Sequence, residues 1–416
     1  MDTAAWTWIV LAFIIVPFIL NFIVELLDLK HTGSELPEEV SDVYNEDEYK
    51  RSLEYHKETS HFGLLNGVIG LAVLIAAIFL GLFAKLDAIA IDLAQSESQV
   101  IRGLIFSAIF FAISHLLGLP ATIYSTFVIE EKYGFNKTTL KTWVVDQIKG
   151  LALAVVIGLP LLALIIYIFS YAAKANNAWL YVWLFLIVFQ TVMMYLSPVL
   201  MSLFNKFEEL KDDKLKNVIE TYAKEHKFAL GGIYQMDGSK RSSKANAFFA
   251  GFGKFRKIVL FDTLIEKLSH EELLVVLAHE MGHFKCKHIT KLMAFGVLSM
   301  GGMLYLLQQL INCDPLYGVF SMEPSIYASI IIISSIILSP LSMMLGLLKN
   351  YYSRKFEYEA DAFAVKTTGL GEKMVSALKK LSQSNLSNLT PHPIKTFLEY
   401  SHPTIVQRIR AIRVIK

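Results

Sequence analysis

Two histidines and a glutamate lie near the middle of the chain at a spacing that suits metal chemistry: His279, Glu280 and His283. Residues four apart share one face of a helix, so both imidazoles can bind the same zinc ion. Glu280 lies beside that pair, where its carboxylate can take a proton from a zinc-activated water. A five-residue pattern with three fixed positions also arises by chance. Here, however, the residues around it are uncharged, and a buried glutamate without a role would be costly.

The third metal ligand decides the class of such a site. One class of zinc proteases places a histidine six residues after the second one, but Ile289 occupies that position and His288 lies one residue off the pattern. On an unbroken helix His288 would face well away from the zinc. We therefore expect His288 to serve polar structure or to orient a ligand.

A later segment, Phe356–Asp361, offers three carboxylates instead. Glu357 and Asp361 are one helical turn apart and share a face, whereas Glu359 points elsewhere. A carboxylate that binds the metal and a second one that orients a ligand histidine would use such a pair. We assign Glu357 to the metal and Asp361 to the orienting hydrogen bond. The alternative is a solvated helix face paired with the two basic residues that precede it.

The elements that must position these residues are long and apolar. The 416-residue chain is 54% hydrophobic and only 18% charged, with a mean hydropathy of +0.47. Soluble proteins carry about a quarter charged residues. A helix needs about 20 apolar residues to cross a bilayer, and seven runs are long enough. They are Ala5–Leu27, Phe62–Phe83, Leu104–Val128, Leu151–Tyr171, Ala178–Leu203, Ile289–Ile311 and Ile326–Leu348.

The first run is predicted to be a retained span, because Asp2 is the only charged residue before it and a signal peptide needs a basic start. Lysine and arginine are concentrated after the first, third and fifth runs and in the C-terminal tail. Positive charge favours the cytoplasmic side. This places the N-terminus outside or in the lumen, and the metal site and C-terminus in the cytoplasm. The host membrane would be the endoplasmic reticulum in a eukaryote or the cytoplasmic membrane in a bacterium.

The chain thus divides into four parts: five spans with their loops (1–204), a polar domain (205–288), two more spans (289–349) and a polar C-terminal part with the third ligand (350–416). Within the polar parts we expect helices at Lys211–Lys227, Asn350–Lys366 and Thr404–Ile415, a strand at Gly231–Asp237 and a hairpin of Ala245–Phe252 with Lys257–Phe261. Ser269 should cap the helix that carries the two histidines.

Four motifs in this order resemble the membrane-embedded M48 metalloproteases, in particular the Ste24-type CAAX prenyl proteases. They are His279–His283 with Ser353–Ala364, Ala245–Phe248, Ile258–Leu264, and Tyr400–Pro403 with Arg408. The resemblance covers nearly the whole chain. It implies an all-α polytopic fold of seven transmembrane helices enclosing a chamber. A gluzincin-like zinc protease domain with a small β-hairpin or sheet would lie at its cytoplasmic end.

The resemblance also implies a function. Zinc, one ion per chain, would activate water to remove the C-terminal tripeptide of prenylated proteins. Asn246, Ala247 and Phe248 would form an edge strand that pairs with the substrate backbone. His402 would donate a hydrogen bond to the oxyanion, and Arg408 would bind a substrate carboxylate. The expected partners are peptide or protein substrates, prenylated ones among them, and membrane lipids, without nucleic acid. We expect a monomer.

Three other functions fit some of these features. An HtpX-like quality-control protease would share the zinc motifs, but it would be shorter and have fewer spans. A transporter or receptor with structural zinc would need a fourth protein ligand, and none is evident. An inactive scaffold is disfavoured because both zinc motifs are intact.

Overall fold

The computed structural model describes residues 2–33, 35–172, 176–250 and 256–415. Within them, six helical spans are long and apolar enough to cross a membrane, and a bent helix pair brings the number to as many as seven. The six are α1 (Thr3–His31), α2 (Glu46–Phe79), α4 with its π-helical end (Gln99–Glu130), α5 with α6 (Leu140–Ala172), α7 (Ala178–Ser202) and α11 (His288–Ile311). This confirms the predicted polytopic helical class.

The seventh span is bent. The apolar stretch Ile326–Ile337 meets α15 (Ser339–Thr368) at an angle of 55°. Pro340 stands at the start of α15, and its ring and missing N–H prevent a straight continuation of the preceding turn. The predicted separate helix at Asn350–Lys366 is instead the end of α15, so one continuous helix runs from the membrane to the predicted third ligand.

The spans extend well beyond a bilayer. Helix α2 has 34 residues, or about 50 Å at 1.5 Å per residue, against a hydrocarbon core of about 30 Å. Its polar first turns are fixed by a capping box between Asn45 and Glu48. Most of the second predicted span, Phe62–Phe83, is therefore the apolar end of a longer helix that begins at Glu46.

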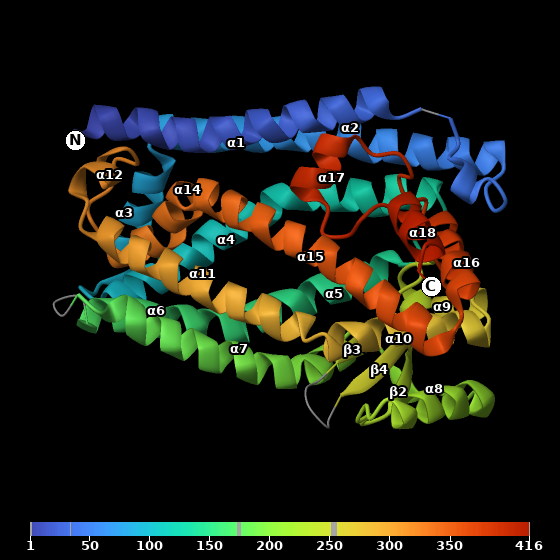
Figure 1. The fold of residues 1–416 in the computed structure, drawn as a ribbon. Coiled ribbons are helices and arrows are strands. Elements are labelled where there is room, and N and C mark those ends of the chain that lie inside the picture. The colour runs from blue at the N-terminus through green and yellow to red at the C-terminus, as the bar shows by residue number, and fades with distance from the viewer. Residues whose placement is uncertain (1, 34, 173–175, 251–255, 416) are drawn as a thin grey trace.

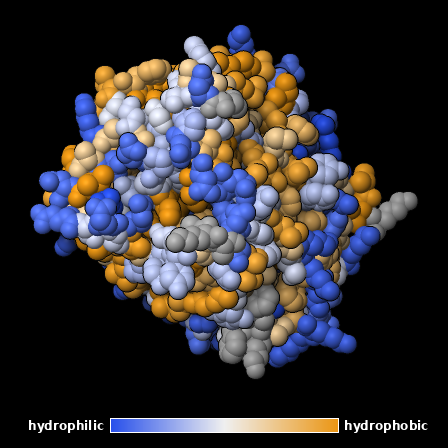
Figure 2. Space-filling model, turned by 90° about the vertical axis from the view of Figure 1, so that its left-hand side faces the viewer, coloured by the Kyte–Doolittle hydropathy of each residue, from blue (hydrophilic) through white to orange (hydrophobic). Residues whose placement is uncertain are grey.

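The spans are sparsely packed. In the most apolar 18-residue window of α7 no residue is buried, and in those of α2 and α11 only 6% are. Such low burial is expected of helices whose apolar faces contact lipid. Figure 2 shows the end that carries the N-terminus, where hydrophilic and hydrophobic residues are interspersed over the surface.

The two chain termini lie at opposite ends of the helix bundle (Figure 1). At the N-terminal end, α3 (Leu82–Ala94) and α12 (Asp314–Gly318) lie almost entirely between the predicted spans. At the other end the polar elements gather: α8 (Asp213–Glu225), α9 (Asp262–Lys267), α10 (His270–Lys285), α16 (Gly371–Ser384), α17 (Pro393–Glu399) and α18 (Ile405–Arg413).

A four-stranded sheet of order β1-β2-β4-β3 belongs to this polar end. The strands are β1 (Phe207–Glu209), β2 (Ile233–Met236), β3 (Ala247–Ala250) and β4 (Lys257–Phe261). Strands β3 and β4 pair antiparallel, as predicted for the hairpin; residues 251–255, which include the end of the first predicted strand, lie outside the described residues. Strand β1 and the parallel pairing of β2 with β4 were not predicted. Strand β3 forms an edge of the sheet.

Candidate metal centre

Helix α10 is anchored at its start and pressed against α15 at its end. Ser269 and Glu272 form a capping box, as the sequence predicts. Near the other end, a Cβ on Gly282 would lie 3.1 Å from the Cα of Ala360 in α15, closer than ordinary van der Waals contact. Any larger residue at position 282 would require α10 and α15 to move apart by a few tenths of an ångström. Gly282 lies between the two histidines, but the residue type alone does not predict this contact.

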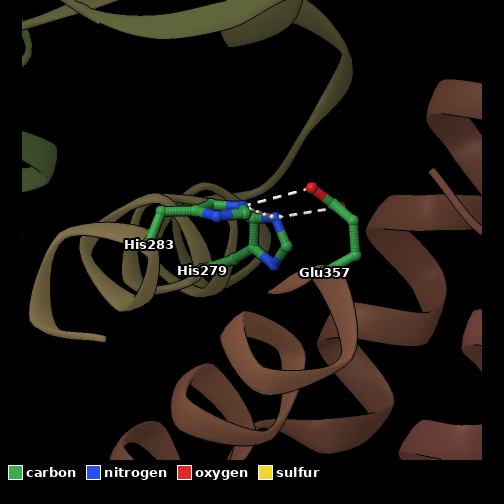
Figure 3. A group of neighbouring side chains, drawn as sticks. All are labelled: His279, His283 and Glu357. Atoms are coloured by element: carbon green, nitrogen blue, oxygen red, sulfur yellow. Dashed lines mark hydrogen bonds and ion pairs between the residues drawn. The ribbon is translucent and has the colours of Figure 1, made fainter. Parts of the chain in front are cut away.

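The close helix contact brings the three predicted metal ligands together (Figure 3). The Nε2 atoms of His279 and His283 are 3.1 Å apart. From these nitrogens to the Glu357 carboxylate, the distances are 3.5 Å for His279 and 3.3 Å for His283. All three ligand atoms lie within 4.8 Å of one another.

The donor set fits a zinc ion. Two imidazole nitrogens and one carboxylate oxygen are the ligands found in catalytic zinc sites, which leave a fourth position open. The Oε2 atom of Glu357 is buried and makes no hydrogen bond of normal geometry; its nearest ionic neighbours are His279 Nε2 at 3.5 Å and Arg408 at 3.4 Å. A buried carboxylate oxygen without a hydrogen bond is expensive, and a cation bound at this point would satisfy it.

Asp361 orients His279 from the far side of the ring. Its Oδ1 lies 2.8 Å from His279 Nδ1, so that nitrogen donates and Nε2 is directed at the other ligands. Arg408 in turn holds Asp361 through two hydrogen bonds, of 2.6 and 2.9 Å. Burial alone would lower the pKa of His279, but the carboxylates of Asp361, which accepts its Nδ1–H, and of Glu357 outweigh it and raise this pKa to about 9. The ring therefore attracts positive charge, either a proton or a metal cation.

Arg408 lies at the site, where it was expected to bind a substrate carboxylate, but in this structure it binds the carboxylate of Asp361. Its guanidinium is buried and its bidentate partner is Asp361 rather than open space for a substrate. Burial opposes its charge, yet the neighbouring Asp361 carboxylate raises the pKa of Arg408 above its usual value.

His402 is also brought to the centre. Its ring is 62% exposed, and its Nε2 lies 3.3 Å from Glu357 Oε1. Glu280 is half-buried on α10, close enough to Arg408 for its charge to help raise the pKa of that guanidinium. Of the expected strand residues, Ala247 and Phe248 lie on the edge strand β3 and the exposed Asn246 precedes it.

His288 does not face away from the centre. Helix α10 ends at Lys285, and Lys287 adopts a left-handed conformation with φ of 57° before α11 begins at His288. The expectation assumed an unbroken helix, and this break turns the ring back until its Nδ1 is 3.1 Å from His283 Nδ1. Left-handed backbone is uncommon for lysine, so the sequence carried no signal for it.

Comparisons with known proteins match both the N-terminal spans and the part of the chain that carries the metal centre. Residues 25–206 match a family model described as CAAX prenyl protease N-terminal, five membrane helices, and residues 209–416 match the model of peptidase family M48. The N-terminal match separates the chain from an HtpX-like protease, which would have fewer spans.

Relatives match over nearly their whole length. A CAAX prenyl protease 1 homolog from Arabidopsis thaliana is 35% identical, with 97% of this chain and 96% of the relative covered. CAAX prenyl protease 1 of Saccharomyces cerevisiae is 34% identical, over 92% of this chain and 89% of the relative. The crystal structure of S. mikatae Ste24p superimposes with a TM-score of 0.92 at 33% identity, covering 98% of this chain and 99% of that one. The chain is therefore a member of peptidase family M48, a zinc metalloendopeptidase embedded in the membrane.

Proposed function

We propose that this enzyme removes the C-terminal tripeptide from prenylated CAAX proteins, and that His279, His283 and Glu357 hold its single zinc ion. The observation that carries the zinc assignment is the meeting of two imidazole nitrogens and one carboxylate within 4.8 Å, with a buried Glu357 oxygen that makes no hydrogen bond. The substrate class is supported by the relatives, which are named CAAX prenyl proteases and match along nearly the full chain.

Bound zinc would polarise the scissile carbonyl and make water acidic enough to lose a proton near neutral pH. Glu280, half-buried beside the ligands on α10, is our candidate for the general base that accepts this proton. His402 remains exposed while reaching the Glu357 carboxylate, so its N–H can turn toward a substrate oxyanion.

Substrate would be held by backbone pairing. Strand β3 has β4 on one side, and its other side is the free edge of the sheet in the described part of the chain. An extended peptide can add to such an edge, with Asn246, Ala247 and Phe248 as partners. Arg408 is committed to Asp361, so we now assign it to orienting that carboxylate and thereby His279.

The orientation follows from charge. In this proposal residues 205–288 and 350–416 form the cytoplasmic part and the N-terminus lies outside or in the lumen, because basic residues are concentrated on the side of the metal centre. The positions of the termini at opposite ends of the bundle support this (Figure 1). The enzyme would act as a monomer surrounded by lipid.

The test uses the purified enzyme with two peptides of the same sequence, one farnesylated at the CAAX cysteine and one not. We expect mass spectrometry to show loss of the last three residues from the farnesylated peptide at a higher rate. Phenanthroline should stop cleavage and added zinc should restore it. Equal cleavage of both peptides, or cleavage elsewhere in both, would contradict the proposed substrate class while leaving the metalloprotease intact.

A further inference from the structure

His288 lies between a candidate zinc ligand and a carboxylate. Its Nδ1 is 3.1 Å from His283 Nδ1, and its Nε2 is 2.9 Å from Glu359 Oε2. The imidazole is buried, whereas the Glu359 side chain is 37% exposed. Three side chains thus form a line that leads from solvent to the metal centre.

The hydrogen positions along this line follow from the chemistry of its ends. An ionised carboxylate only accepts hydrogen bonds, so His288 Nε2 must donate to Glu359. A neutral imidazole that carries its hydrogen on Nε2 has a lone pair on Nδ1. The hydrogen between the two Nδ1 atoms then belongs to His283, which leaves the lone pair of His283 on Nε2. This is the atom that faces His279 and Glu357.

We propose that Glu359 and His288 are positioning residues that hold His283 in the tautomer required to bind zinc. The inference rests on the zinc site of the proposed function. It gives the second histidine the support that Asp361 gives the first, but through an intervening ring. Glu357, Glu359 and Asp361 all belong to α15, so one helix would supply a metal ligand and the orienting carboxylates of both histidines.

A competing use of the same atoms is a separate cation site, since Cys286, His288 and Glu359 offer ligand atoms within 4.8 Å of one another. A cation on His288 Nε2 would move the hydrogen of that ring to Nδ1. His283 would then have to accept at Nδ1 and carry its own hydrogen on Nε2, where zinc must bind. The two uses exclude each other. The buried nitrogen and oxygen atoms of His288 and Glu359 all have hydrogen-bond partners, so none of them calls for a cation.

The decisive variant is His288→Phe. The His288 ring stacks on Phe356 with centroids 4.2 Å apart and an interplanar angle of 7°, and phenylalanine preserves that stack while removing both nitrogens. Zinc affinity of the purified enzyme, measured by competition with a chelator, should fall by about 10–100-fold, the usual effect of losing an outer partner of a metal ligand. His288→Asn offers an amide oxygen close to the former Nδ1 position and should recover most of the affinity.

Two further variants complete the test. Glu359→Gln keeps an acceptor for His288 and should lose less affinity than His288→Phe. His270→Phe removes another histidine–carboxylate pair: His270 at the start of α10 contacts Asp212, the residue before α8. This variant should leave zinc affinity unchanged. A folded His288→Phe protein with wild-type zinc affinity would overturn the proposal that His288 and Glu359 position His283. So would a second zinc ion in the wild-type protein that disappears in Cys286→Ser. Failure of the wild-type protein to bind zinc would instead overturn the zinc site itself.

Discussion

The same packing device joins helices at both ends of the molecule, with different consequences. At the metal end, Gly282 of α10 faces backbone atoms of Ala360 in α15. At the opposite end, a Cβ on Gly103 of α4 would lie 2.6 Å from the Cβ of Tyr327 and 2.7 Å from a methyl group of Ile166. The first contact sets the distance between two helices that carry the candidate ligands. The second lies within an apolar cluster that carries none of them.

Substitutions at the two contacts should therefore have different effects, one on zinc binding and turnover and the other on stability alone. At the metal end a buried polar network, including Asp361 and Arg408, depends on the spacing of α10 and α15. At the other end Gly103 meets only the Cβ of Tyr327 and a methyl group of Ile166, and none of the candidate ligands is nearby. Damage to the metal end should therefore appear in zinc binding and turnover, whereas damage to the other end should appear in the free energy of unfolding.

The largest effect at the metal end should come from Glu280→Gln. We expect turnover to fall by about 10²–10⁴-fold, the usual contribution of a general base, because glutamine cannot accept the proton. Zinc content should remain that of the wild type. Glu271→Gln, an exposed position on the same helix, is the matched control. Turnover retained in Glu280→Gln would remove the general-base assignment.

Next in size is Glu357→Ala, which removes a candidate ligand. Zinc affinity should weaken by more than about 100-fold, since even partners outside the ligand set contribute about 10–100-fold. Metal analysis after dialysis measures the loss, with Glu372→Ala on the neighbouring α16 as the control. Unchanged zinc content would move the third ligand to Glu359 or Asp361.

At the metal end, the sequence predicts the arrangement of residues that lie within one helical turn of each other. The spacing of His279 and His283 fixes a shared helix face, and the spacing of Glu357 and Asp361 does the same on α15. The same reasoning placed Glu359 elsewhere. It does point away from the three ligands, yet it reaches them through His288, because the chain turns sharply at Lys287. A non-glycine residue in left-handed backbone leaves no trace in the sequence.

In the membrane part, too, the sequence predicts the individual elements better than the bends and connections between them. Runs of apolar residues predicted the spans, because a bilayer needs only length and hydropathy. Length and hydropathy do not predict the bend before Ser339, although Pro340 marks it. Nor does periodicity tell a short apolar helix beside a membrane, such as α3, from the end of a span.

Gly282→Ala tests the metal-end contact directly. The added methyl group must push α15 away from α10, so we expect turnover to fall about tenfold and unfolding to become easier by about 1–3 kcal/mol, as for other overpacked contacts. Gly296→Ala in α11, where a Cβ would meet nothing within 4 Å, is the control and should gain up to about 1 kcal/mol from helix propensity. Normal turnover in Gly282→Ala would show that the ligands do not depend on this spacing.

The smallest effect on chemistry should come from Gly103→Ala. The methyl group would meet Tyr327 and Ile166, so the free energy of unfolding should fall by about 1–3 kcal/mol in detergent. Zinc affinity and turnover per folded molecule should match the wild type, because no candidate ligand lies in that cluster. Gly118→Ala, on the same helix with nothing within 4 Å, controls for the change in helix propensity. A loss of zinc affinity in Gly103→Ala would mean that the two ends are coupled, since a strain at the apolar end would then reach α15 through the bend that precedes it.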